Sequence, residues 1–280
     1  MSTFNTVVKN IAEDGNMIET KKFWTQKEQD IEKAREMWNG RAEKFDRNTT
    51  KEPSKEWDSF EFLKKKGLDF KDMSVLDVGC GAGRFLIRFA PEAKEVIGID
   101  ISPEMIKRAN AHIENMNFKN AKAMVLPWQE QDLEKAGFVK KFDLVFANMT
   151  PAINNEETLM KMCDASKKYC FMSSFTKRSS SIENALAKDV LKRELKQSDV
   201  SKIYSSFNTL WLNGYFPEIT YHDSDWEDEM DWAEAESWYT SVAVNEEEKE
   251  AIRKYLKSIE KDGKILNKTH STVAWMFWEV

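Results

Sequence analysis

The stretch that decides the fold is VLDVGCGAGRF, residues 75–85, in which a short apolar run leads directly into a glycine-rich turn. Gly79, Gly81 and Gly83 allow the backbone to approach a ligand closely and to adopt dihedral angles that a Cβ would forbid. The residues after the turn predict a helix, and the first N–H groups of a helix have no partner within it. The strand, turn and helix together predict a site for a nucleotide-like ligand.

Short apolar or β-branched runs recur on both sides of this stretch, and helical segments separate most of them. Alternation of strands and helices favours a parallel sheet with helices on both faces. Ser102 and Pro103 begin one of these helices, with an N-cap oxygen followed by a proline at the first helical position. The predicted strands are 74–79, 95–100, 121–126, 142–148, 168–175, 217–224 and 271–280.

Further helices are predicted near both ends of this pattern. An amphipathic helix over 24–46 has apolar residues at helical spacing, and a shorter helix after it ends at Gly67. Another helix, 201–213, ends at Gly214. The apolar positions of the first two helices are Ile31, Ala34, Trp38, Ala42 and Phe45, and then Trp57, Phe60 and Leu63.

Two segments interrupt the alternation of strands and helices, at about 177–200 and 224–268. The first predicts an inserted helix with Ser180 as its N-cap. The second is part of a strongly acidic stretch, because residues 203–248 contain twelve Asp or Glu and no Lys or Arg. We expect this segment to be helical as far as about Gly263.

Two classes of cofactor compete for the glycine-rich turn. Asp100 ends the next strand, where doubly wound folds place a carboxylate that accepts hydrogen bonds from ribose hydroxyls. A dinucleotide fingerprint, GxGxxG, would need a glycine or alanine where this chain has Arg84 or Leu86, so the spacing argues against it. The remaining pattern, Asp77 followed by GxGxG from Gly79, resembles the first motif of the class I S-adenosylmethionine-dependent methyltransferases.

Other segments resemble the same family and cover most of residues 38–223 together with the last strand. The resemblance implies an α/β fold: a Rossmann-like, seven-stranded, mostly parallel sheet with an antiparallel last strand and helical lid insertions. It also implies an N-terminal helical cap over 1–66 and a methyltransferase domain over 67–280. The segments are WNGRAEKFD (38–46), VIGIDISPEMIKRA (96–109), LPWQEQD (126–132), KFDLVFANMTPAI (141–153) and NGYFPEITYHD (213–223).

The resemblance further implies S-adenosylmethionine as cofactor and S-adenosylhomocysteine as product. Many relatives carry an acid at the end of the third strand that recognises the adenine amino group, and this chain has Lys122 there. The adenine contact is therefore assigned to Trp128 and Gln129. The implied cofactor-binding residues are Asp77, Gly79, Cys80, Gly81, Gly83, Asp100, Ile101, Met105, Trp128, Gln129 and Asn148.

The acceptor site is expected at the carboxyl ends of the parallel strands, where ligands bind in this topology. Both insertions leave the sheet at that edge, so we expect them to form a lid over the methyl donor, which favours a small-molecule acceptor. His222 and His270 are predicted at strand ends as candidate catalytic bases, with Asn148 and Thr150 orienting the acceptor. The expected substrate-wall residues are Trp38, Trp211 and Tyr239.

The acidic stretch suggests an amine as acceptor. From Asp223 to Tyr239 it interleaves three tryptophans and a tyrosine with eight acids, which is the composition of a cage for a cation. A solvated helix face whose tryptophans pack into the core is the simpler interpretation of the same pattern. The rings in question are Trp226, Trp232, Trp238 and Tyr239.

Charge and composition exclude several classes of protein. The 280 residues carry a net charge of −6, which argues against a nucleic-acid partner. No apolar run approaches the ~18 residues of a membrane span, and the N-terminus does not resemble a signal peptide. Three cysteines without a CxxC pair encode neither a disulfide framework nor a zinc site. We expect a cytoplasmic protein with no metal and no membrane contact.

Two other functions fit the same motifs. A catalytically silent S-adenosylmethionine-binding protein that regulates or scaffolds a partner would keep the donor motifs intact. A methyltransferase of macromolecules would keep them too, although the acidic balance and the predicted lid argue against it.

Overall fold

The computed structural model describes residues 24, 30–50, 58–195 and 201–280, which divide into two compact units. The first unit comprises Met1–Ser174, Ser201–Thr220 and Trp275–Val280, and the second comprises Phe175–Val200 and Tyr221–Ala274. The predicted position of Trp57 lies outside the described residues. Among the described helices, none is long and apolar enough to cross a membrane.

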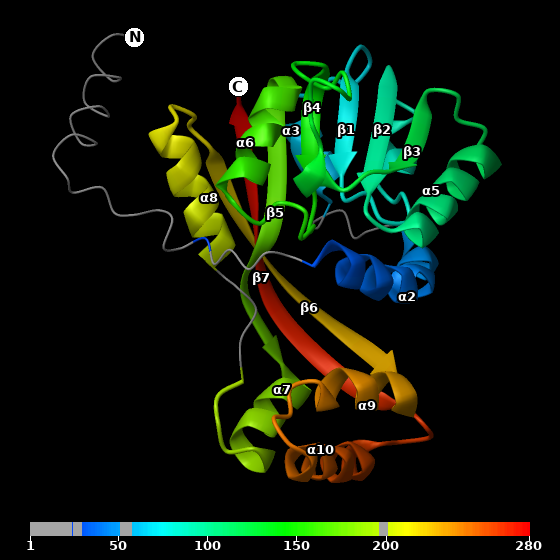
Figure 1. Ribbon diagram of the computed structural model, residues 1–280, viewed down its shortest axis with the longest axis vertical. Helices are drawn as coiled ribbons and strands as arrows, with labels where there is room; N and C mark the ends of the chain where they lie inside the picture. The colour runs from blue at the N-terminus through cyan, green and yellow to red at the C-terminus, as the bar shows by residue number, and fades with distance from the viewer. Residues whose placement is uncertain (1–23, 25–29, 51–57, 196–200) are drawn as a thin grey trace, which may run out of the picture. The chain divides into compact units, whose positions relative to one another are not determined.

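A seven-stranded sheet in the order β3-β2-β1-β4-β5-β7-β6 organises the chain (Figure 1). β1 pairs in parallel with β2 and β4, and β2 and β4 pair in parallel with β3 and β5. The carboxyl ends of these strands therefore meet at one edge. The strands are β1 (Ser74–Val78), β2 (Glu95–Asp100), β3 (Ala121–Val125), β4 (Phe142–Ala147), β5 (Ser166–Ser180), β6 (Glu218–Met230) and β7 (Ile265–Glu279).

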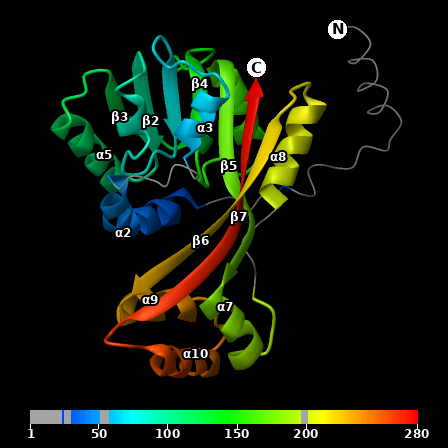
Figure 2. The ribbon, with the colours of Figure 1, turned by 180° about the vertical axis from the view of Figure 1, so that it is seen from behind.

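The last strand is antiparallel to its neighbours, as expected. The Val280 N–H donates to the Lys168 carbonyl at the start of β5 (2.8 Å), whereas farther along β5 the Thr176 hydroxyl donates to the Thr272 carbonyl (3.1 Å). The two strands therefore run in opposite directions. The arrows in Figures 1 and 2 show the same opposed directions.

Helices cover both faces of the sheet in the first unit, with α6 on one face and α3 on the other (Figures 1 and 2). The α3 face contains a cluster of phenylalanine rings, with Phe60 on Phe70 at 5.1 Å between centroids. The helices of this unit are α2 (Ile31–Thr49), α3 (Ser59–Lys65), α4 (Leu86–Phe89), α5 (Pro103–Asn115), the 3₁₀ turn η3 (Trp128–Glu130), α6 (Glu156–Ala165) and α8 (Ser201–Leu212).

Several predicted helix boundaries are confirmed by capping contacts. The Ser102 hydroxyl accepts the Met105 N–H at 3.1 Å, and Pro103 is the first residue of α5. α8 ends before Gly214, which has a φ of 83°. The leading helix begins later than predicted, at Ile31, because the Asp30 carboxylate accepts the Lys33 N–H and caps α2 there.

The second unit combines the far ends of β5, β6 and β7 with four helical segments. Its apolar core contains Ile182 of the first insertion and Leu256 of the second, so the two predicted insertions fold together. Ser180 caps the first helix, as predicted, by accepting the Glu183 N–H. The helical segments are α7 (Ser181–Ala185), the π turn η4 (Leu186–Val190), α9 (Trp232–Thr240) and α10 (Glu246–Ile259).

The prediction that the acidic segment is helical from its start is wrong, because residues 223–230 continue β6. Exposed and half-buried side chains alternate along it, as they do in a strand with one face packed. Trp226 on the packed face stacks on Phe175 of β5, at 6.1 Å between ring centroids. This contact stabilises the strand conformation of the segment, whereas a helix would place Trp226 among the acidic side chains.

We predict that an ion pair in the second unit makes stability fall at acid pH. Arg193 donates Nε and Nη2 to the two carboxylate oxygens of Glu248, at 3.0 and 2.7 Å. Arg193, and next the Val244 N–H, lower the pKa of Glu248 to about 2. The pair therefore stabilises the fold above the ordinary pKa of 4.5, and this stabilisation is lost as the pH falls from there toward 2.

Thermal unfolding of Glu248→Gln across pH 7 to 2.5 measures the effect. The variant should melt below the wild type at pH 7, and the two melting temperatures should converge as the pH falls. Glu247→Gln, which changes an exposed neighbour, is the control and should follow the wild type. A constant difference between Glu248→Gln and wild type at all pH values would contradict the prediction.

Candidate cofactor site at the carboxyl edge of the sheet

The glycine-rich turn after β1 has the backbone that its sequence predicts. Gly79, Gly81 and Gly83 have φ angles of 72°, 53° and 90°, in the region that L side chains rarely adopt. A Cβ on Gly83 would lie 2.9 Å from the Ala109 Cβ of α5, so only glycine allows this approach. A Cβ on Gly79 would lie 2.0 Å from the Thr150 hydroxyl, so the turn and the segment after β4 are also in contact.

Asp100, at the end of β2, is held by the turn itself. Its carboxylate accepts the Gly81 N–H at 3.0 Å and the Ser102 N–H at 2.9 Å, one on each oxygen. Burial raises the pKa of Asp100, and these N–H donors oppose the rise. A carboxylate has about four acceptor positions, so both oxygens keep capacity for the hydroxyls of a ribose.

Asp77, in β1, has a buried carboxyl group with unused hydrogen-bonding capacity. The residue is 1% exposed, and its Oδ2 has no hydrogen-bond partner. Burial, and next the charge of Asp100, raise the pKa of Asp77 to about 8. A buried acceptor without a donor is unusual and costly. The amino group of S-adenosylmethionine is a donor of the right kind, so these residues fit the cofactor.

Met105 and Trp38 come together beside the turn, as candidates for the cofactor and the substrate wall. Met105 packs with Ala42 and Ala82, and Trp38 lies against this cluster. Helix α2 is tied to the end of β2, because the Arg35 Nε donates to the Ile101 carbonyl at 3.4 Å. The leading helix therefore lies beside the cofactor turn, as the family resemblance implies.

Asn148 and Thr150 follow β4 at the same edge. The Ser173 hydroxyl donates to Asn148 Oδ1 at 2.9 Å and accepts the Met149 N–H at the same distance. The Lys202 ammonium donates to the Thr150 carbonyl at 2.8 Å. Ser173 and Lys202 were missed at the sequence level, because only the order of the strands brings β5 and α8 to this loop.

Trp128 and Gln129 differ in how much surface they offer to an adenine. Trp128 is 2% exposed, and its indole N–H donates to the Thr158 carbonyl at 3.0 Å. The ring therefore fills the core, and the prediction that it flanks the adenine is corrected for that reason. Gln129 is half-buried and keeps surface for a ligand.

Cys80 is buried in the turn, and burial raises the pKa of its thiol well above the ordinary value.

The three predicted wall residues are divided between the two units. Trp211 lies on α8 in the first unit and is 40% exposed, next to Phe207 and Phe216. Tyr239 belongs to the second unit, is 1% exposed and fills its apolar core. A wall role for Tyr239 is therefore corrected to a packing role, while Trp38 and Trp211 remain candidates.

The two candidate bases lie within long strands, so their predicted placement at strand ends is wrong. His222 is in β6 and His270 is in the middle of β7, because both strands extend farther than their apolar residues indicate. His270 Nδ1 lies 2.7 Å from an oxygen of Asp225, across the two strands. A neutral imidazole that donates its Nδ1–H to this carboxylate would leave Nε2 as the nitrogen available to accept a proton.

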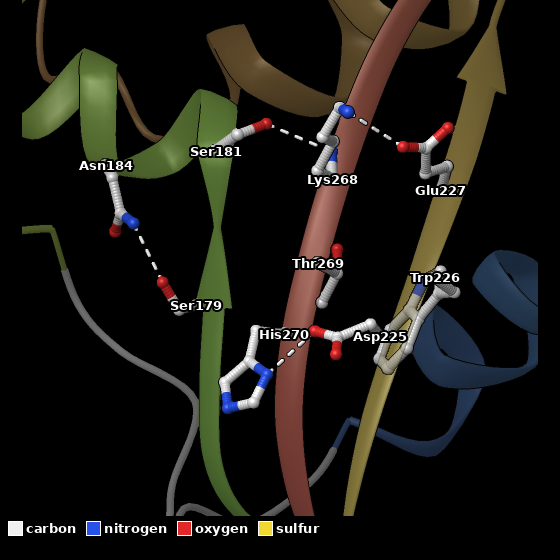
Figure 3. A pocket seen from close by; sticks show the side chains of 9 residues that line it. All are labelled: Ser179, Ser181, Asn184, Asp225, Trp226, Glu227, Lys268, Thr269 and His270. Atoms are coloured by element: carbon white, nitrogen blue, oxygen red, sulfur yellow. Dashed lines mark hydrogen bonds and ion pairs between the residues drawn. The ribbon is translucent and has the colours of Figure 1, made fainter.

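His270 lines an open groove in the second unit, with a volume of about 610 Å³ (Figure 3). Its charged groups are paired across β6 and β7, and the Lys268 ammonium lies 2.9 Å from Glu227. The lining residues come from β5, α7, β6 and β7: Ser179, Ser181, Asn184, Asp225, Trp226, Glu227, Lys268, Thr269 and His270.

The expected cage of aromatic rings around a cation does not form as one site. The Trp226 N–H donates to Asp228 in β6, and the Trp232 N–H donates to Glu236 in α9. The Lys257 ammonium already lies over the Trp232 ring, 5.2 Å from its centroid. In the described ranges, no cluster of three or more His, Cys, Asp or Glu residues is arranged to hold a metal ion.

Curated proteins match this chain over short stretches. An uncharacterised methyltransferase of Schizosaccharomyces pombe is 33% identical over 91 residues, which is 31% of this chain and 30% of that protein. The ribosomal protein L11 methyltransferase of Colwellia psychrerythraea is 36% identical over 84 residues, which is 30% of this chain and 26% of that protein. The chain thus spans less than a third of the length of these curated relatives.

Solved structures align over more of the chain at lower identity. A putative methyltransferase from Bacillus halodurans has a TM-score of 0.49 at 16% identity, covering 79% of this chain and 98% of that one. The YcgJ protein of Bacillus subtilis has a TM-score of 0.47 at 13% identity, covering 78% and 96%. A family model described as a methyltransferase domain matches residues 69–237, more than half of the chain. The chain therefore belongs to this family of S-adenosylmethionine-dependent methyltransferases.

Proposed function

We propose that the protein transfers a methyl group from S-adenosylmethionine to a small-molecule acceptor. The observation that carries the proposal is the Oδ2 of buried Asp77, which has no hydrogen-bond partner. The glycine-rich turn that follows this strand binds a second carboxylate, Asp100, through the Gly81 N–H. The cofactor has a cationic amino group at one end and ribose hydroxyls nearer the other. The two carboxyl groups supply an acceptor for each.

The chain's own residues would hold the cofactor along the carboxyl edge of the sheet. Asp77 would accept the amino group, and Asp100 would accept the ribose hydroxyls beside its bonds to Gly81 and Ser102. The adenine would lie beside Ile101 and Gln129, which are half-buried, with Asn148 at the far side, whereas Met105 is 2% exposed and packs beneath them.

The bound cofactor supplies an electrophilic methyl group on a sulfonium. Transfer is an in-line displacement, so the protein contributes by alignment and by exclusion of water. Asn148 and Thr150 would orient the acceptor, because both lie directly after β4 and Thr150 contacts Gly79. Trp38 would cover the site from α2, where it already packs beside Met105.

A small-molecule acceptor is favoured over a macromolecule by charge. The chain has a net charge of −6, and its acidic residues concentrate in 203–248. Nucleic-acid binding needs a basic surface to neutralise phosphates. The similarity to the L11 methyltransferase covers 84 residues, which are 26% of that protein, so its acceptor is not carried over to this chain.

An amine is the first class of acceptor to test. An ammonium must lose a proton before its nitrogen can attack the methyl group. His270, oriented by Asp225, is suited to take that proton, and Glu227 adds negative charge to the same groove.

Methyl transfer from a labelled cofactor tests the proposal directly. Purified protein would be incubated with S-[methyl-¹⁴C]adenosylmethionine and, separately, with the small-molecule, RNA and protein fractions of a cell extract. We expect label in the small-molecule fraction and S-adenosylhomocysteine as coproduct, both absent with Asp100→Ala. Label in RNA or protein, or no transfer to any fraction, would overturn the proposed acceptor class.

We predict that Asp100→Ala weakens binding of S-adenosylmethionine by about thirtyfold, equivalent to ~2 kcal/mol, because a charge-assisted pair of hydrogen bonds is lost. Isothermal titration calorimetry measures the change. Glu104→Gln is the matched control, since it removes an exposed charge from the first turn of α5 nearby. Equal affinity for Asp100→Ala and wild type would show that the ribose is held elsewhere.

We also predict that cofactor binding releases a proton near neutral pH. With a pKa of about 8, Asp77 is mostly protonated at pH 7, and an ammonium placed against it lowers that pKa. Affinity should therefore rise with pH from 6 to 8. Calorimetry in buffers of different ionisation enthalpy counts the released proton.

Asp77→Asn should remove both the proton release and the pH dependence. Because the folded-state pKa of this acid lies above its ordinary 3.8, wild-type stability decreases as the pH rises from about 4 to 8. Cofactor-free Asp77→Asn should accordingly melt above the wild type at pH 8 and approach it at pH 4. Proton release that persists in the variant would assign the titration to another group.

A further inference from the structure

Arg178 is a half-buried arginine on β5 in the second unit, without an anionic partner. Its Nε is buried and has no hydrogen-bond acceptor. Within the described part of the chain, no carboxylate lies within ion-pair distance of its guanidinium. The guanidinium lies over the Phe175 ring, whose centroid is 5.8 Å from the guanidinium carbon.

This arginine differs from the others of the same unit. Arg193 is paired with Glu248, and Arg253 is paired with Glu236. An arginine keeps its charge in proteins, so burying one without an acceptor is costly. In a unit rich in Asp and Glu, the absence of a partner indicates that Arg178 is kept for an acceptor from outside the chain.

Ser271 on β7 is a second buried donor without a partner. The residue is 0% exposed, and its Oγ makes no hydrogen bond. The strand register places it on the same face as Arg178. Ser180 on β5 donates to Asn267 on β7 at 2.7 Å, so these two side chains lie on the same face of the sheet. Arg178 is two positions from Ser180, and Ser271 is four positions from Asn267. Side chains an even number of positions apart in a strand point to the same face, so Arg178 and Ser271 share this face.

Aromatic rings lie beside the Arg178 guanidinium. Trp226 stacks on Phe175 next to the guanidinium. The Asp228 carboxylate, on the packed side of β6, accepts the Trp226 N–H and makes no ion pair with Arg178. The His270 and Asp225 pair occupies the opposite face, because residues 270 and 271 are adjacent in a strand.

We propose that Arg178 and Ser271 form a binding site for an oxyanion, a carboxylate or phosphate group carried on a flat apolar body. The guanidinium would pair with the oxyanion, the Ser271 hydroxyl would donate to it, and the Phe175 and Trp226 rings would contact the apolar body. That the ligand is the methyl acceptor rests on the proposed function. The binding of the anion itself does not.

Benzoate and inorganic phosphate are the probes, titrated separately into the full chain. Isothermal titration calorimetry gives the affinity, and ¹⁵N NMR of the arginine Nε–H groups identifies the residue that responds. The Arg178 signal is assigned by its loss in Arg178→Lys. We expect this signal to shift with benzoate or with phosphate, and the probe that binds more tightly distinguishes a carboxylate site from a phosphate site.

Variants separate a specific site from general attraction of anions. Arg178→Met should weaken the tighter probe by at least about tenfold, and Ser271→Ala by about threefold. Lys177→Met is the matched control, since it removes an exposed charge from the adjacent residue of β5, and should change affinity less than twofold. Melting curves of Arg178→Lys and Arg178→Met establish that the variants are folded.

An unshifted Arg178 signal, or equal weakening in Arg178→Met and Lys177→Met, would overturn the site. Titration with S-adenosylmethionine in the same samples keeps the two proposals separate. Anion binding without cofactor binding would contradict the proposed function and support the anion site. Cofactor binding without a response to either anion would support the proposed function and contradict the anion site.

Discussion

The bond from the Gly81 N–H to the Asp100 carboxylate is the interaction on which the cofactor half of the structure depends. It joins the turn after β1 to the end of β2, and it requires a backbone dihedral at Gly81 that other residues rarely adopt. Helix α5 then packs against Gly83 through Ala109. One turn thus fixes the spacing of two strands and a helix. Asp77 is buried beneath them, and its Oδ2 has no hydrogen-bond partner.

The cofactor half was predictable because its signals are local. Three glycines at fixed spacing, the cap at Ser102 and the glycine after α8 each act within a few residues, and the structure confirms the elements they predict. The lengths of β6 and β7 were not predictable in this way. Acids are poor strand formers, and Trp226 favours a strand only because Phe175, far away in sequence, lies beside it. The burial of Trp128 and Tyr239 depends on tertiary packing in the same way.

The two units of the chain carry different chemical groups, with Asp77 and Asp100 in the first and Arg178 in the second. Sequence similarity to each of the two curated methyltransferases covers about a third of the chain. The second unit is assembled from two insertions that share one apolar core, and it holds the unpaired Arg178. A family that keeps one donor and varies its acceptors is expected to vary in such insertions.

β6 is the edge strand of the sheet, and its acidic residues have a consequence for how copies of the protein meet. Asp223, Asp225, Glu227 and Glu229 occupy every second position along its exposed side. An open strand edge is a template for another strand, and a row of like charges repels any identical edge that approaches. Acidic side chains along β6 therefore disfavour pairing of two identical edges, and neutralisation by acid or by a polycation would weaken this effect.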